Sequence, residues 1–196
     1  MKTYIDKAMN YNEYVDLLDN LMAEGKTTGA NQSEDYINYA KLNLARMHRL
    51  NKTATLTNEL KDVLQKVKFP FIFLVLTEGW CGDAAQNIPT IHLIEEKCKK
   101  IELKLIFRDE NLELMDQYLT DGGRSIPKLI CLNKVSLKEV FTWGPRPDAV
   151  QRIMHELREK KADPKDKAEK IHGWYAADKT LSLQKELKEL IEKYLT

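Results

Sequence analysis

The chain has 196 residues, of which 31 are Lys or Arg and 30 are Asp or Glu, so its formal net charge is +1 at pH 7. This balance gives no basis for a nucleic-acid partner or for binding to a membrane surface. Hydrophobic residues make up 43% of the chain, enough for a substantial core, and the length favours one domain with extensions. Three cysteines, an odd number in a chain of this size, argue against a secreted disulfide framework and favour a reducing, cytoplasmic location.

Two kinds of targeting segment are not expected. The first residues lack the apolar stretch that follows the basic residues of a secretory signal. The longest apolar run, residues 69–76, is far shorter than the roughly 20 residues that a membrane-spanning helix needs.

Residues 1–66 are expected to form a helical N-terminal extension. Apolar residues share one face of a helix over residues 11–22. A second helix is predicted to begin at Ser33, an N-cap residue followed by acidic residues, and to continue through Leu50. A third is predicted to start near Thr57.

Residues 67–161 alternate between strand and helix patterns. The continuous apolar run 69–76 is typical of a strand covered on both faces, and a helix is predicted over 84–100. A strand over 103–107 and a short helix over 112–119 follow. Strands over 126–132 and 139–143 are close enough in sequence to form a hairpin, and a helix over 149–161 comes next. This order predicts an α/β fold with a mixed sheet of four to five strands flanked by helices.

Residues 162–196 are expected to form a C-terminal helical extension. Residues 163–167 are polar and typical of a linker, whereas 183–195 have the pattern of a closing amphipathic helix. We expect the three regions to fold as one compact domain.

The segment Trp80-Cys81-Gly82, at the junction between the first strand and its helix, resembles the thioredoxin active site. Further landmarks in register are Pro89, Asp109 after the second strand, the pair Ile126-Pro127, and Gly144 after the last strand. The resemblance covers about half of the chain and implies a thioredoxin-like fold.

The same resemblance implies roles for residues around the nucleophile. Pro127 would be cis, leaving backbone groups beside Ile126 free to pair with an extended peptide laid across the sulfur. Trp80 would be an exposed ring shielding Cys81, with Gly82 beside the bound substrate. A closer resemblance, carried by Glu78 with residues 80–86 and 143–147, is to bacterial thioredoxin-like proteins that have helical extensions and no assigned substrate.

Cys81 is the candidate nucleophile. A cysteine in the first turn of a helix meets unpaired amide donors and the positive end of the helix dipole, which favour the thiolate and predict a lowered pKa. Asp83 and Glu78 flank the cysteine and would make its thiol less acidic than the helix position alone suggests. Either carboxylate could instead carry a proton to or from the sulfur. For Asp83 the structural alternative is an acidic residue that stabilises the first helical turn.

The motif Cys-Gly-Asp-Ala lacks the second cysteine of the family, because Ala84 stands in its place. Cys98 would lie about 25 Å from Cys81 along a helix, and Cys131 lies about 13 Å from Pro127 along a strand. A disulfide needs Cα atoms within about 7 Å, so both are expected to be buried core thiols.

Arg146 lies in a rigid turn of alternating glycine and proline after the last strand. The ordinary interpretation is a solvated side chain, and the alternatives are a pair with Asp83 or a site for an anionic thiol. The four histidines have no metal-ligand spacing, so no metal and no cofactor is expected.

Two functions from different classes follow. The first is a monothiol redox protein, in which the Cys81 thiolate reacts with disulfides or oxidised thiols and an external thiol regenerates it. Its partner would be an oxidised protein or a low-molecular-weight thiol. The second is a redox-inactive module that binds a peptide or protein. The sequence gives no indication of an oligomeric state.

Overall fold

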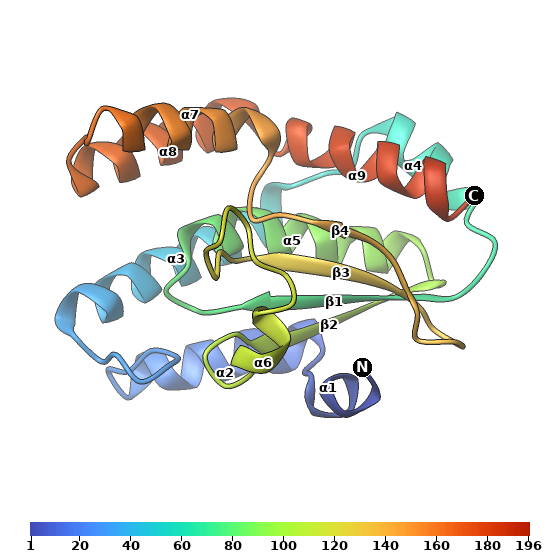
Figure 1. The fold of residues 1–196 in the computed structure, drawn as a ribbon, viewed down its shortest axis with the longest axis horizontal. Helices are drawn as coiled ribbons and strands as arrows, with labels where there is room; N and C mark the ends of the chain where they lie inside the picture. Colours follow the sequence, from blue (N-terminus) through green and yellow to red (C-terminus); the bar gives the residue numbers. More distant parts are fainter.

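A computed structural model describes residues 1–196, and its elements follow the predicted order (Figure 1). The N-terminal helices are α1 (Lys2–Lys7), α2 (Tyr11–Ala23), α3 (Glu34–Thr53) and α4 (Asn58–Gln65). The central region contains β1 (Phe71–Thr77), α5 (Gly82–Lys97), β2 (Ile101–Phe107), α6 (Leu112–Met115), β3 (Lys128–Asn133), β4 (Glu139–Trp143) and α7 (Asp148–Glu159). The chain closes with α8 (Pro164–Asp178) and α9 (Leu181–Tyr194).

The four strands form one mixed sheet in the order β2-β1-β3-β4. Strand β1 pairs parallel with β2 and antiparallel with β3, and β3 and β4 form the predicted hairpin. Every residue of β1 is buried, which explains why its sequence is continuously apolar rather than alternating. The predicted mixed sheet flanked by helices is confirmed.

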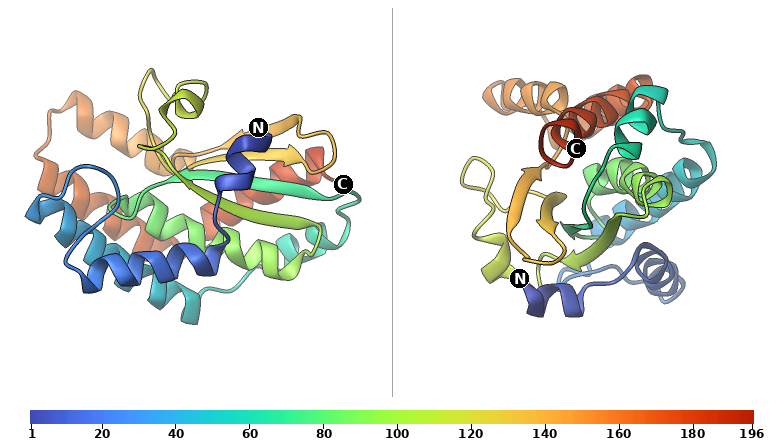
Figure 2. Two further views of the ribbon diagram at one scale, coloured as in Figure 1. Left: turned by 90° about the horizontal axis from the view of Figure 1, so that it is seen from below. Right: turned by 90° about the vertical axis from the view of Figure 1, so that its right-hand side faces the viewer.

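Helices cover both faces of the sheet. Helix α5 packs against β2 and α3, whereas α9 packs against β4 and α4. Helix α6 and its loop lie on the opposite side of the sheet from α3, α4 and α5 (Figure 2). A single large core of 41 buried residues joins the sheet to the N-terminal helices and to α9.

The N-terminal extension is helical, and it also touches the sheet edge. The helices predicted over 11–22, from Ser33 and near Thr57 are all present, and α1 is an additional short helix. Between α1 and α2, Met9 pairs with Leu105 of β2 through two backbone hydrogen bonds of 2.8 Å. This contact satisfies part of an edge strand that would otherwise expose unpaired backbone groups.

The prediction of a linker over residues 163–167 was wrong, because these residues begin α8. The Asp163 side chain accepts a hydrogen bond from the Lys165 backbone N–H at 2.8 Å, and Pro164 occupies the first helical turn. Both features are typical of a helix start. Helices α7 and α8 pack together around a second, small cluster of buried residues: Val150, Leu157, Ile171 and Tyr175.

The predicted short helix over 112–119 is shorter in the structure and ends at Met115. All three cysteines are free and buried, with Cys98 at the end of α5 and Cys131 in β3. None of the helices combines the length and the apolar composition that crossing a lipid bilayer would require.

Candidate functional site

Cys81 lies in the turn between the end of β1 and the start of α5. It is the N-cap residue of α5, and its Sγ accepts a hydrogen bond from the Ala84 backbone N–H at 3.4 Å. The Cys81 thiol donates to the Ile126 carbonyl at 3.3 Å, and the peptide bond between Ile126 and Pro127 is cis. The sulfur therefore faces the cis-proline loop, as the resemblance implies.

The predicted lowering of the Cys81 pKa was wrong. Cys81 is only 8% exposed, and burial raises its pKa to about 12. The negative charge of Asp83 raises the pKa further, while the Ala84 N–H and the charge of Arg146 act in the opposite direction. Loss of hydration outweighs the helix terminus because a thiolate in an apolar setting loses most of its solvation. At neutral pH Cys81 is a protonated thiol.

Asp83 sits at the centre of a buried network. Its Oδ2 accepts hydrogen bonds from Arg146 Nε at 2.9 Å and Arg146 Nη2 at 2.5 Å, and its Oδ1 accepts from the Tyr175 hydroxyl at 2.8 Å. Asn87 Nδ2 donates to the Asp83 carbonyl at 2.7 Å and to the Tyr175 oxygen at 3.0 Å. Arg146 also donates to Gln151 Oε1 at 3.2 Å. The network joins α5, the β4–α7 loop, α7 and α8.

This geometry corrects the interpretation of Arg146 as a solvated side chain and selects one of its alternatives. The Arg146 and Asp83 side chains are 9% and 12% exposed, so they form a buried ion pair. Every polar atom of the Asp83 carboxylate is engaged. Asp83 therefore links α5 to the β4–α7 loop and to α8. Its partner in α8, Tyr175, was not predicted, because the sequence around it contains no recognisable motif.

Glu78 is fully buried and is directed toward the end of β2. Its Oε1 accepts a hydrogen bond from the Asp109 backbone N–H at 2.9 Å, and its Oε2 has no hydrogen-bond partner. Burial raises the pKa of Glu78. This hydrogen bond links the turn after β1 to the turn after β2. Glu78 therefore connects the ends of two neighbouring strands.

Trp80 was expected to be an exposed ring, but the structure shows it partly buried. Its ring lies 5.1 Å from the ring of Tyr36, which α3 supplies, and the guanidinium of Arg108 lies 4.8 Å from the Trp80 ring centre. Trp80 is less exposed than expected because the N-terminal extension contributes α3, whose Tyr36 covers part of the ring.

His172 of α8 lies directly against the first turn of α5. A Cβ atom built on Gly82 would be 2.8 Å from His172 Cε1, so the two groups touch. His172 Nδ1 is buried without a hydrogen-bond partner, and burial, followed by the charge of Arg46, lowers the His172 pKa to about 4. The sequence analysis considered the histidines only as metal ligands and did not predict this contact. The aromatic residues Trp174 and Tyr175, which follow His172 closely in sequence, were the one feature that could have indicated a packed segment here.

The cis-proline loop offers one free backbone group. The Ile126 carbonyl is occupied by the Cys81 thiol, which corrects the expectation that it is free for a peptide. The Ile126 backbone N–H has no hydrogen-bond partner in the protein. In a strand-addition site this N–H would be the donor beside Cys81.

A cavity of about 390 Å³ adjoins the turn that contains Cys81. It lies between α3 on one side and α7 and α8 on the other. Its lining is largely apolar and aromatic and consists of Tyr36, Tyr39, Asn43, Trp80, Gly82, Asp83, Met154, Pro164, Lys167, Ala168, Ile171 and His172. No group of three or more His, Cys, Asp or Glu side chains is placed to hold a metal ion.

Comparisons with known proteins agree with this fold. The family model described as Thioredoxin matches residues 29–163. A crystal structure of a protein of unknown function, PA1234 from Pseudomonas aeruginosa, is similar with a TM-score of 0.59 and 18% identity, covering 94% of this chain and 98% of the other. An HIV 4E10 epitope-scaffold is similar with a TM-score of 0.56 and 18% identity, covering 94% and 99%. No curated protein matches the chain. Because the family model covers more than half of the sequence, the chain belongs to the thioredoxin family.

Proposed function

We propose that this protein is a thioredoxin-fold binding module, which takes up a peptide with a large apolar side chain beside Cys81. The observation that carries the proposal is the cavity of about 390 Å³ at the Trp80–Asp83 turn. Its walls come from α3 and α8, elements that the helical extensions add to the core.

The chemistry of the turn supports binding over disulfide exchange. The attacking species in exchange is a thiolate, and a pKa of about 12 leaves Cys81 protonated at neutral pH. A resolving cysteine is missing because Ala84 occupies that position, and Ala84 is 1% exposed. Both oxygens of the Asp83 carboxylate are bonded, to Arg146 and to Tyr175, and neither contacts the Cys81 sulfur.

In this proposal an extended peptide would lie across both the cavity and the proline loop. The Ile126 N–H would donate to a peptide carbonyl, as in strand addition, and one apolar side chain would enter the cavity between Trp80 and Tyr39. Aromatic walls give large contact areas with little loss of side-chain entropy.

Binding is tested with indole, which mimics one aromatic side chain, and with the peptide acetyl-Gly-Gly-Trp-Gly-Gly-amide. Titration followed by amide NMR shifts is expected to move signals of Trp80 and Gly82, more strongly with the peptide. Tyr39→Ala should weaken binding about fivefold, because Tyr39 is 45% exposed and its loss opens the cavity wall. Tyr194→Ala is the matched control, since Tyr194 is 44% exposed and lies outside the cavity. Equal weakening by both variants, or no shifts near Trp80, would reject the proposal.

A second candidate is the monothiol redox function, which one observation favours. Sγ of Cys81 accepts the Ala84 N–H and lies beside the cis-proline loop, where a mixed disulfide would form. In this reaction the Cys81 thiolate would attack one sulfur of a disulfide, form a mixed disulfide and release the other sulfur as a thiolate. An external thiolate would then attack the partner sulfur of the mixed disulfide, form a new S–S bond with it and release Cys81 as a thiolate.

Alkylation by iodoacetamide separates the two functions. With its pKa near 12, Cys81 should react at pH 7 roughly a thousandfold more slowly than glutathione, and the rate should rise about tenfold per pH unit up to pH 10. Peptide mapping by mass spectrometry assigns the label to Cys81. A rate at pH 6 that equals or exceeds that of glutathione would favour the redox function.

A further inference from the structure

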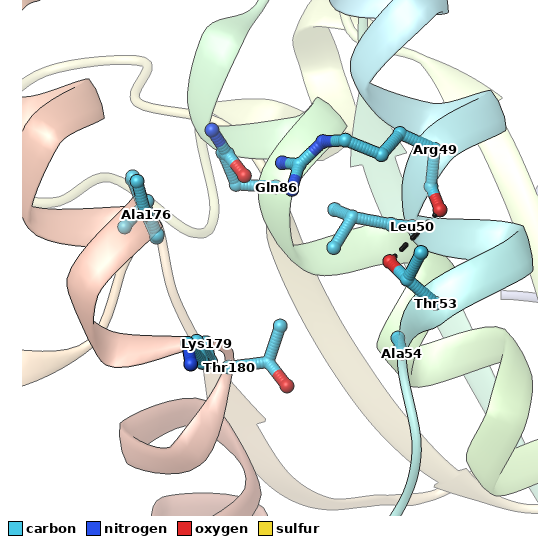
Figure 3. A pocket seen from close by; sticks show the side chains of 9 residues that line it. Arg49, Leu50, Thr53, Ala54, Gln86, Ala176, Lys179 and Thr180 are labelled. Atoms are coloured by element: carbon cyan, nitrogen blue, oxygen red, sulfur yellow. Dashed lines mark hydrogen bonds between the residues drawn. The ribbon is translucent and has the colours of Figure 1, made fainter.

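A second cavity, of about 280 Å³, lies between the C-terminal parts of α3 and α8, further along both helices than the Trp80 cavity. Figure 3 shows the side chains that line it. It is bounded by the end of α3, the second turn of α5 and the junction between α8 and α9. Its lining consists of Arg49, Leu50, Thr53, Ala54, Gln86, Tyr175, Ala176, Lys179 and Thr180. Only Tyr175 also belongs to the network around Asp83.

The charges on this lining have one sign. Arg49 and Lys179 are both cationic, no Asp or Glu lines the cavity, and neither cation forms a salt bridge with the protein. The same side of α3 carries a further cation, Arg46, whose pKa is lowered by burial and then by the charge of Arg49. The positive potential is thus concentrated at this end of α3 without internal compensation.

Gln86 adds an uncharged polar group to the lining. Its side chain belongs to α5 and points into the cavity, and the Arg49 guanidinium extends over the cavity toward it (Figure 3). Gln86 is only 6% exposed, yet its amide forms no hydrogen bond with the protein. The amide atoms are not themselves sealed from solvent, so they are open to a hydrogen-bond partner that enters the cavity.

The rest of the lining defines the shape of the ligand. Leu50, Ala54 and the Tyr175 ring are apolar, so the cavity joins an apolar wall to two cations and one amide donor. Its volume is just below the usual range for small-molecule sites, which begins near 300 Å³. We propose that this cavity binds a small organic oxyanion, a carboxylate or a phosphate, with its charge between Arg49 and Lys179 and one oxygen accepting from the Gln86 amide.

Three probes separate charge, headgroup and apolar body. Benzoate carries a carboxylate on an apolar ring, benzamide is its neutral counterpart, and inorganic phosphate carries the charge alone. Amide NMR titration of the full chain should show saturable shifts at Gln86, Ala176 and Lys179. Benzoate or phosphate is expected to bind at least tenfold more tightly than benzamide, and the tighter of the two identifies the headgroup.

Variants test the three anchoring groups. Arg49→Gln and Lys179→Gln should each weaken oxyanion binding roughly tenfold, because each removes one charged donor at an exposed position that packing does not need. Gln86→Leu should weaken binding without changing the net charge. Arg152→Gln and Lys185→Gln are matched controls, since both remove one exposed cation outside the cavity.

The outcomes are decisive in either direction. Loss of binding in the three cavity variants with retention in both controls supports the site. Equal weakening in the control variants would show general attraction of anions to a cationic surface and would overturn the proposal, as would equal affinity for benzoate and benzamide. Indole titration at the Trp80 cavity is a separate readout, so failure here leaves the peptide-binding proposal to its own test.

Discussion

Asp83 and Arg146 are 63 residues apart in sequence, and they form a buried ion pair with two hydrogen bonds to one carboxylate oxygen. The pair fastens the first turn of α5 to the loop that follows β4. Tyr175 adds a third hydrogen bond from α8 to the same carboxylate. The turn that carries Cys81 is therefore held by residues from two later segments of the chain.

Removing Arg146 is expected to destabilise the fold. Arg146→Met keeps much of the side-chain volume but leaves the buried Asp83 charge without its partner, which should lower the free energy of unfolding by about 3 kcal/mol. Urea unfolding followed by circular dichroism measures the change. Arg124→Met is the matched control, because the pair of Arg124 with Asp116 is about half exposed, at 46% and 47%. The control should lose less than about 1 kcal/mol. A loss in Arg146→Met no larger than in the control would contradict the buried pair.

His172 is expected to make stability depend on pH below neutrality. Burial lowers the His172 pKa to about 4 in the folded state; the charge of Arg46 acts in the same direction, and the charge of Asp83 acts in the opposite direction. The unfolded chain takes up this proton near pH 6.5, before the folded protein does. The contribution of neutral His172 to stability is thus complete above pH 6.5 and is lost as the pH falls through 4.

The variant His172→Gln isolates this effect. Between pH 7 and pH 4.5 the wild-type protein should lose on the order of 2 kcal/mol more unfolding free energy than the variant. His48→Gln serves as the control, because the His48 side chain is 44% exposed. Parallel pH curves for wild type and His172→Gln, measured by urea unfolding, would show that His172 titrates normally.

The contact between Gly82 and His172 predicts a thermodynamic coupling. Gly82→Ala places a methyl group against the imidazole of His172 and should lower the unfolding free energy by about 1 kcal/mol. In the His172→Ala background the same change should be neutral or favourable, because alanine is the better helix former. A double-mutant cycle measures the difference. Additive effects would mean that the two residues do not touch.

Gly144 is expected to tolerate no side chain. Its φ is +105°, and an added Cβ would collide with the backbone carbonyl of Pro127, which cannot rotate away. Gly144→Ala should lower the unfolding free energy by about 3 kcal/mol. Gly122 also has a positive φ, +74°, but nothing lies within 4 Å of its added Cβ. Gly122→Ala should therefore lower the unfolding free energy by only about 1 kcal/mol, which is the effect of backbone strain alone. The difference between the two variants, measured by thermal unfolding, gives the effect of the collision at Gly144.

Local patterns predicted most of the architecture. The continuous apolar run after residue 68 indicated a buried strand, and the structure places all of β1 in the core. The hairpin of β3 and β4, the N-cap at Ser33 and the start of a helix near Thr57 were also predicted, because strand periodicity and helix-start signals depend on residues a few positions apart. Helix α8 was missed because its polar first turn hides a short and interrupted apolar pattern.

What the sequence determined by itself was the placement of one cysteine at a strand-to-helix turn, opposite a proline loop. What only the tertiary structure decided was the chemical state of that cysteine and of its neighbours. The pKa of Cys81 depends on the water that the folded chain excludes and on the charges of Asp83 and Arg146. The spacing of nearby residues does not indicate a contact between residues as far apart in sequence as Asp83 and Tyr175. The burial of these side chains and their hydrogen bonds are therefore known only from the folded structure.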